Sequence, residues 1–161
     1  MVCLLCRLLR PHSSRNSLLV RLTQTPLMEN EMTERYWLTP PEIYNELDDE
    51  FHFDFDPCPN PRPPCYDSLI LPWGNMNYCN PPFRKTDGNT HGPTAFVRKA
   101  ISEQAQGKST VLLIPAQSYI NLLLEAGAEL RAAGRVRFLE VGTKEPLASP
   151  SPTILAVLRG E

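Results

Sequence analysis

Asn80-Pro81-Pro82-Phe83 directly follows the short apolar stretch from Met76 to Cys79, and together they predict a strand that ends in a stiff turn. The two consecutive prolines hold φ at about −65°, so the main chain has little freedom at this turn. The turn brings together two hydrogen-bond acceptors, the Asn80 side-chain oxygen and the Pro81 main-chain carbonyl. A simpler interpretation is that Asn80 only closes a turn and that Phe83 packs in the core.

The two acceptors suit one chemical task. The lone pair of an exocyclic amine on an aromatic ring is delocalised, which makes the amine a poor nucleophile. If Asn80 and the Pro81 carbonyl each accept one N–H, the lone pair becomes localised on nitrogen and can attack an electrophile. The ring of Phe83 offers a flat face for a stacked base, a contact worth about 1–3 kcal/mol. We therefore predict that Asn80, Pro81, Pro82 and Phe83 are the catalytic residues.

The Asn-Pro-Pro-Phe sequence resembles the catalytic motif of the S-adenosylmethionine-dependent amino-methyltransferases, which methylate adenine N6, cytosine N4 or a glutamine amide. Three further motifs precede it, in an order similar to that of the short phage and prophage DNA N6-adenine methyltransferases. They are Trp37-Leu38-Thr39-Pro40, Phe53-Asp54-Phe55-Asp56-Pro57-Cys58 and Trp73-Gly74. The resemblance extends from Tyr36 to Leu158 and makes DNA adenine-N6 methylation the expected function.

The resemblance implies an α/β fold, a compact Rossmann-like methyltransferase sheet that is mostly parallel with an antiparallel C-terminal strand. It implies S-adenosylmethionine as the cofactor and a flipped-out adenine in DNA as the substrate. The cofactor residues that it implies, without any metal, are Trp37, Thr39, Pro40, Asp54, Asp56 and Pro57. Asp56 and Pro57 correspond to the end of the first strand at the cofactor, with Asp54 as their neighbour. The alternative is that one of the two aspartates only forms a turn.

One feature departs from most methyltransferases. The Gly-rich loop that commonly follows the first strand is absent, and the segment from Cys58 to Cys65 takes its place. About two dozen residues then separate the first strand from Asn80, too few for two intervening helix–strand units. The same short spacing resembles that of the phage and prophage enzymes, so the departure agrees with that group.

The length of 161 residues allows one domain, but not a catalytic domain together with a separate recognition domain. Residues 1–27 are basic and contain no acidic residue. This composition is typical of a transit peptide, or of an extension upstream of the true start, so we exclude these residues from the core. We expect a single methyltransferase domain over residues 28–161.

The net charge is −2, so binding to DNA requires a local basic surface. The candidates are Arg84-Lys85, Arg98-Lys99, Lys108, Arg131, Arg135 and Arg137, although each one alone is better explained as a solvated charge. Five cysteines without a secretory signal suggest a reducing compartment, and we expect the cytoplasm of a bacterium or of a phage-infected cell. The spacing of the cysteines does not match a zinc site, and no apolar run is long enough to span a bilayer.

Capping and periodicity predict the remaining elements. Thr39-Pro40-Pro41-Glu42 matches a capping box in which Thr39 is the N-cap of a short helix. Further expected elements are a strand over 51–58, a loop over 84–93, a helix over 94–106, a buried parallel strand over 110–115, a helix over 117–124, a strand over 136–139 and an antiparallel last strand over 153–158.

Other functions remain compatible with the same residues. The Asn-Pro-Pro-Phe motif does not distinguish adenine N6 from cytosine N4, whereas a glutamine-amide substrate agrees less well with the surrounding motifs. A catalytically silent nucleic-acid-binding module of the same fold is a second alternative, because a missing Gly-rich loop is compatible with lost activity. A zinc-linked nucleic-acid protein without enzymatic activity is a third. The DNA recognition sequence, the oligomeric state and the protection of host or phage DNA are not predicted.

Overall fold

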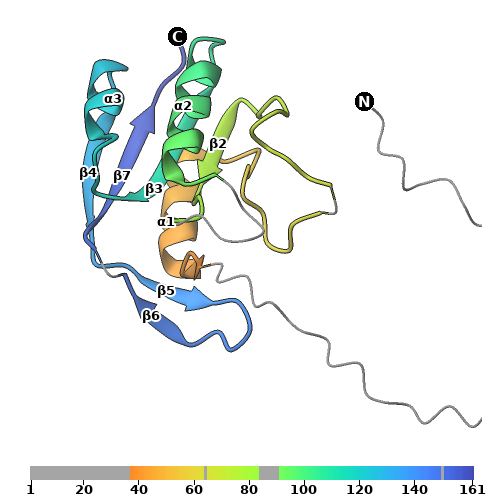
Figure 1. The fold of residues 1–161 in the computed structure, drawn as a ribbon, viewed down its shortest axis with the longest axis vertical. Coiled ribbons are helices and arrows are strands. Elements are labelled where there is room, and N and C mark those ends of the chain that lie inside the picture. Colours follow the sequence, from red (N-terminus) through yellow and green to blue (C-terminus); the bar gives the residue numbers. More distant parts are fainter. Residues whose placement is uncertain (1–36, 64, 84–90, 150) are drawn as a thin grey trace, which may run out of the picture. The chain divides into compact units, whose positions relative to one another are not determined.

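The computed structural model describes residues 37–63, 65–83, 91–149 and 151–161 (Figure 1). The expected leader, 1–27, and most of the expected loop over 84–93 lie outside the described residues. The elements in chain order are β1 (Trp37–Leu38), α1 (Pro41–Phe51), β2 (Met76–Cys79), α2 (Pro93–Gln104), β3 (Ser109–Pro115), α3 (Ile120–Glu125), β4 (Glu129–Gly134), β5 (Arg137–Glu140), β6 (Pro146–Ala148) and β7 (Thr153–Leu158).

Four strands form a mixed sheet in the order β2-β3-β7-β4. β2 and β3 are parallel, with Cys79 opposite Leu112, and the chain crosses between them through α2. β7 is antiparallel to both β3 and β4. The expected mostly parallel Rossmann-like sheet is therefore wrong, since β2 and β3 are the single parallel strand pair in the described part of the chain. The physical reason is that the last strand inserts between β3 and β4, two strands that run in the same direction.

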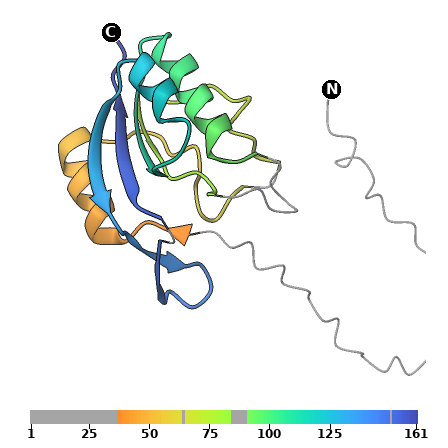
Figure 2. The same ribbon diagram turned by 60° about the vertical axis from the view of Figure 1, so that its left-hand side comes forward.

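A second sheet of three strands has the order β1-β5-β6 and is antiparallel throughout. β5 and β6 form a hairpin, and β1 pairs with β5 through Trp37 opposite Glu140 and Leu38 opposite Leu139. Figure 2 shows β1 beside this hairpin, at one end of the mixed sheet. The sequence analysis did not anticipate this sheet, because β1 and β6 are too short to carry a periodic pattern.

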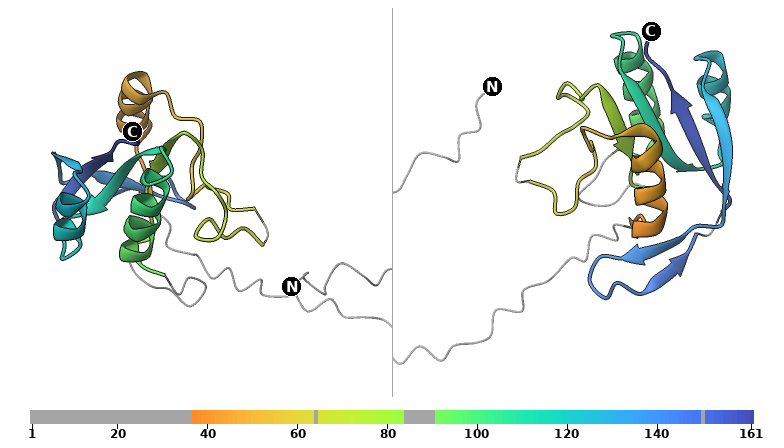
Figure 3. Two further views of the ribbon diagram at one scale, coloured as in Figure 1. Left: turned by 90° about the horizontal axis from the view of Figure 1, so that it is seen from above. Right: turned by 180° about the vertical axis from the view of Figure 1, so that it is seen from behind.

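Helices cover both faces of the mixed sheet (Figure 3). α1 packs on the face that includes Tyr78 and Leu113, whereas α2 and α3 pack on the face that includes Cys79 and Leu112. Neighbouring residues of one strand therefore enter different cores, as the period of two in a strand requires. Within the described ranges, no helix is long and apolar enough to cross a membrane.

Several predicted elements are confirmed. The last strand is Thr153–Leu158, and the buried apolar run forms Ser109–Pro115, in which every residue after the first is buried. The helix expected over 94–106 is Pro93–Gln104. Gly107 follows it with φ +82°, a left-handed conformation that glycine adopts without a Cβ clash and that commonly ends helices.

The start of α1 differs from the prediction. The helix begins at Pro41, its N-cap is Pro40, and no side chain caps it. The Thr39 hydroxyl is not available for capping because it is hydrogen-bonded to the Tyr78 hydroxyl instead. The predicted capping box is therefore wrong. Because proline has no N–H, Pro41 at the first helical position leaves one fewer N–H group that needs a cap.

The expected strand over 51–58 is also wrong. α1 continues through Phe51, and His52 ends it in a left-handed conformation with φ 56°. Within the segment that follows, Phe55 alone makes a bridge to the mixed sheet, parallel to Asn77. Pro57 has no N–H to donate, so a regular ladder cannot continue past it.

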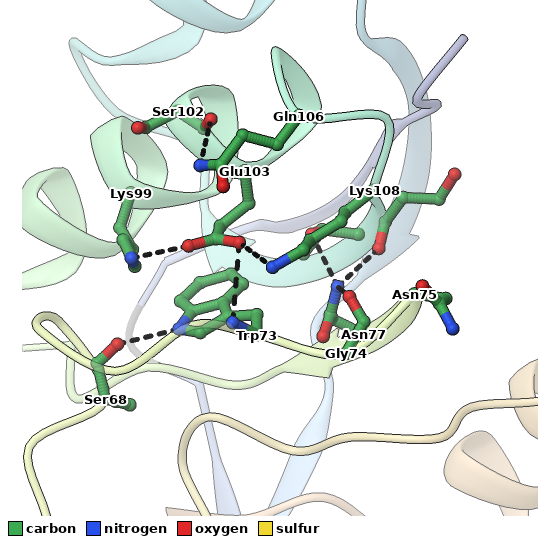
Figure 4. A network of polar contacts seen from close by, with 12 residues as sticks. Ser68, Trp73, Gly74, Asn75, Asn77, Lys99, Ser102, Glu103, Gln106 and Lys108 are labelled. Carbon is green, nitrogen blue, oxygen red and sulfur yellow. Dashed lines mark hydrogen bonds and ion pairs between the residues drawn. The ribbon is translucent and has the colours of Figure 1, made fainter.

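A buried ion-pair network connects α2 to the segment that leads into β2 (Figure 4). Glu103 is 1% exposed, and its two carboxylate oxygens accept hydrogen bonds from Lys99 Nζ and Lys108 Nζ, each at 2.5 Å. The main-chain N–H of Trp73 donates to the same carboxylate at 3.4 Å, and the Trp73 indole N–H donates to the Ser68 carbonyl at 2.7 Å. The carboxylate thus holds Trp73 against α2 just before β2 begins.

Candidate functional site

Asn80 lies immediately after β2 and is 9% exposed. Its Nδ2 donates to the Trp37 carbonyl at 2.8 Å and to Thr39 Oγ1 at 3.2 Å. These partners assign the orientation of the amide, because a carbonyl oxygen can accept a hydrogen bond but cannot donate one. No group in the described part of the chain donates to Asn80 Oδ1, so this oxygen remains an acceptor with a fixed direction.

The Pro81 carbonyl is the second acceptor at this turn. Pro81 is buried, and no donor among the described residues binds its carbonyl oxygen. Pro82 is half-buried and restricts the main chain on the other side of that carbonyl. The structure therefore places two acceptors without a donor among the described residues, Asn80 Oδ1 and the Pro81 carbonyl, on consecutive residues at the carboxyl end of β2.

Phe83 belongs to an aromatic cluster formed by Trp37, Phe83 and Phe138. The Phe83 ring meets Trp37 and Phe138 edge to face, with centroid distances of 5.6 and 5.3 Å. Trp37 and Phe138 stack at 5.7 Å. Phe138 is fully buried and Phe83 is half-buried, so the cluster anchors the turn to β1 and β5. Stacking of a base on Phe83 remains a prediction.

Tyr78 places a hydroxyl beside Thr39. The two hydroxyl oxygens are 2.5 Å apart, and Tyr78 is 2% exposed. Burial raises the pKa of Tyr78 well above its ordinary value, more than the Thr39 hydrogen bond lowers it. The phenol is therefore neutral at physiological pH, and one hydrogen bond joins it to the Thr39 hydroxyl.

Asp56 is a half-buried residue on the segment beside β2, and its carboxylate is largely withdrawn from water. Its Oδ1 accepts the Cys58 N–H at 2.7 Å. Burial raises the pKa of Asp56 to about 6, although the Cys58 N–H acts in the opposite direction. Within the described ranges, no basic side chain forms an ion pair with it. Asp56 is thus ionised at neutral pH without a cation from the described residues, and Pro57 beside it is buried.

Asp54 and Pro40 have structural partners. Asp54 Oδ2 accepts the Asn75 N–H at 3.1 Å, and its Oδ1 accepts the Met76 N–H at 3.0 Å. This approach requires Gly74, since a Cβ there would lie 2.2 Å from Asp54 Oδ1. Pro40 accepts the first N–H groups of α1 with its carbonyl. These contacts account for Asp54 and Pro40 without a cofactor.

Two buried thiols lie under the turn. Cys58 Sγ and Cys79 Sγ are 4.0 Å apart without a disulfide. Burial and the hydrogen bond with Cys58 raise the pKa of the Cys79 thiol well above its ordinary value, so it stays protonated. No cluster of three or more His, Cys, Asp or Glu side chains suited to a metal ion occurs among the residues that the structure describes.

The predicted basic residues divide into two groups. Lys99 and Lys108 bind the buried Glu103, and Arg131 binds Glu50 at 2.8 Å and Glu129 at 2.6 Å. The hydrogen bond from Arg131 lowers the pKa of both of these glutamates. Exposed residues without an ion pair in the described part are Arg98, Arg135 and Arg137, while Arg84 and Lys85 lie outside it.

The sequence analysis missed two residues of the site, Tyr78 and Phe138. A signal for Tyr78 was present, because residues two apart in an extended chain share a face and Tyr78 precedes Asn80 by two. Phe138 had no local signal, since it reaches Trp37 and Phe83 only through the pairing of β1 with β5.

Comparisons with known proteins add no assignment. No protein-family model, no curated protein and no solved structure matches this chain.

Proposed function

We propose that this chain is a DNA adenine-N6 methyltransferase that uses S-adenosylmethionine. The observation that supports it most directly is a pair of acceptors, Asn80 Oδ1 and the Pro81 carbonyl, on consecutive residues of a restricted turn, to which none of the described residues donates. Both N–H groups of Asn80 are already bound to Trp37 and Thr39. Two adjacent acceptors match the two N–H groups of an exocyclic amine.

The residues of the turn act on the amine. Asn80 Oδ1 and the Pro81 carbonyl each accept one N–H, which localises the nitrogen lone pair and directs it away from the turn. The nitrogen would gain a bond to the methyl carbon as the bond between that carbon and the sulfonium sulfur breaks, which leaves a neutral thioether, and the surplus proton would then be lost to solvent. No general base is needed for this sequence. The acceptors are held before the substrate arrives, since the prolines and the aromatic cluster restrict the turn.

S-adenosylmethionine, when bound, supplies an electrophilic methyl group on a sulfonium sulfur. Asp56 fits such a cofactor best, because its buried carboxylate has no counter-cation among the described residues and can accept from an ammonium or a ribose hydroxyl. Pro57 follows Asp56 directly, and Trp37 lies against the turn through its carbonyl, which accepts from Asn80, so both remain in the proposed cofactor site. Asp54, Thr39 and Pro40 are left out of it because their polar groups have protein partners.

The proposed substrate is a base rotated out of the duplex, since the amine of a stacked base pair cannot reach a buried turn. Phe83 then offers the exposed part of its half-buried ring. Arg135 just before β5, Arg137 at the start of β5 and Arg98 on α2 are exposed cations that can reach phosphates.

Methyl transfer from labelled S-adenosylmethionine to unmethylated DNA tests the proposal, followed by digestion to nucleosides. We expect labelled N6-methyladenine from the wild type and from Asn121→Ala, a control on the exposed surface of α3, and none from Asn80→Ala. Labelled N4-methylcytosine would keep the chemistry and change the substrate. A protein that binds neither S-adenosylmethionine nor DNA would refute the proposal, and one that binds DNA without any transfer would refute it in favour of the silent nucleic-acid-binding module.

A further inference from the structure

The Thr39 hydroxyl lies between Asn80 and Tyr78. It accepts Nδ2 of Asn80 at 3.2 Å and contacts the Tyr78 hydroxyl at 2.5 Å. We propose that Thr39 and Tyr78 are positioning residues that determine which end of the Asn80 amide faces the substrate amine. This inference rests on the proposed function, in which the oxygen of Asn80 must face the amine.

The orientation of the amide matters because its two ends have opposite hydrogen-bonding character. Oδ1 accepts, whereas Nδ2 only donates, so a reversed Asn80 would point N–H groups at an amine that also needs acceptors. Oxygen and nitrogen of an amide have nearly the same size, so packing alone cannot choose between the two orientations. Hydrogen-bond partners make the choice.

The first partner, the Trp37 carbonyl, accepts at 2.8 Å and cannot donate. The second, Thr39, is a hydroxyl, which could either accept from Nδ2 or donate to a reversed Oδ1. Tyr78 limits this ambiguity. Either hydroxyl can be the donor of the contact between Thr39 and Tyr78, and when Thr39 gives its single proton to Tyr78 it can only accept from Asn80.

Tyr78 is well placed for this role. Its ring packs edge to face against Tyr44 at 5.1 Å and, tilted by 51°, against Phe53 at 5.2 Å, so the hydroxyl has a defined position. Tyr78 and Asn80 leave the same side of the extended chain, and Thr39 reaches them from the segment between β1 and α1. The end of β2 and the segment between β1 and α1 therefore meet at one amide.

A positioning role and a cofactor-binding role for Thr39 predict different kinetic effects. If Thr39 held S-adenosylmethionine, removing its hydroxyl would raise KM for the cofactor with kcat unchanged. If Thr39 orients Asn80, the loss appears in kcat, because fewer molecules present Oδ1 to the amine.

The decisive variants are Thr39→Val, Thr39→Ser and Tyr78→Phe, compared in steady-state methyl transfer. We expect Thr39→Val to lower kcat by about tenfold to a hundredfold and Tyr78→Phe by about tenfold, with KM for S-adenosylmethionine within about twofold of wild type. Thr39→Ser keeps the hydroxyl and should recover kcat to within about threefold. Thr94→Val, an exposed position at the start of α2, is the matched control.

A second readout does not depend on activity. In protein labelled with ¹⁵N-asparagine, the side-chain NH₂ signal that disappears in Asn80→Ala should exchange slowly with water in the wild type and in Thr39→Ser, and faster in Thr39→Val. Unchanged exchange in Thr39→Val, or an increase in KM for the cofactor at constant kcat, would overturn the inference. A wild type that transfers no methyl group would refute the proposed function, while the exchange rates would still decide the role of Thr39.

Discussion

Replacing Glu103 by glutamine should destabilise the fold more than any other single charge removal on α2. Glu103 is 1% exposed and binds Lys99 and Lys108, whose side chains are 17% and 18% exposed. Removing one partner of a buried ion pair costs about 3–5 kcal/mol, because the other charge is left unpaired. Both lysines retain access to water, so we expect the lower end, about 3 kcal/mol, and a midpoint lower by about 10 °C.

The effect should depend on pH. Burial alone raises the pKa of Glu103, but the hydrogen bonds from Lys108 and Lys99 outweigh it and hold the pKa below the ordinary value of 4.5. A carboxylate with a lowered folded pKa stabilises the folded state above its unfolded pKa, and this contribution is lost as the pH falls through the folded pKa. The difference between wild type and Glu103→Gln should therefore be full at pH 7 and shrink below about pH 4.5.

Thermal unfolding followed by circular dichroism at pH 7 and at acidic pH measures both effects. Glu46→Gln is the matched control, because Glu46 is an exposed residue of α1, and its midpoint should correspond to a change within about 0.5 kcal/mol. A Glu103→Gln midpoint within about 2 °C of wild type at pH 7 would contradict the expectation that the Glu103 carboxylate stabilises the fold through Lys99 and Lys108. It would mean that the desolvation of the carboxylate cancels its attraction to the lysines.

Three further predictions follow from single contacts. Gly74→Ala places a Cβ 2.2 Å from Asp54 Oδ1 and should cost about 1–3 kcal/mol in urea unfolding, whereas Gly142→Ala, which meets nothing within 4 Å, should not. Asp56→Asn should stabilise the fold by up to about 3 kcal/mol at pH 7.5, because burial raises the pKa of Asp56 to about 6, and this gain should vanish as the pH falls from 6 towards 4. Phe138→Ala should lower stability by about 3–5 kcal/mol and reduce the near-ultraviolet dichroism of the aromatic cluster.

The predicted elements that the structure confirms depend on local signals, and those that it corrects depend on contacts between distant residues. Strong local signals gave elements that the structure confirms, such as the apolar run that forms Ser109–Pro115 and the strand Thr153–Leu158. The capping box at Thr39 failed because a long-range partner, Tyr78, binds the hydroxyl that the local rule assigns to the helix. The strand over 51–58 failed because its polar side chains bind main-chain N–H groups, as Asp54 does at Met76.

The candidate site shows the same division. The motif residues Asn80 and Pro81 were visible in the sequence because both acceptors belong to neighbouring residues on a proline-restricted turn. Thr39 was also selected, but for a cofactor contact, since the sequence does not show which groups meet across about forty residues. The structure brings its hydroxyl to Asn80 and Tyr78 instead.

Local sequence signals were enough to locate the stiff turn, the buried strands and the helix Pro93–Gln104, because propensity, periodicity and proline geometry act within a few residues of the chain. The strand order, the direction of the Asn80 amide and the partners of Asp54 and Glu103 are seen only in the folded chain. These depend on which segments pack side by side, and the free energy that selects them comes from burial and hydrogen bonds between residues far apart in the chain.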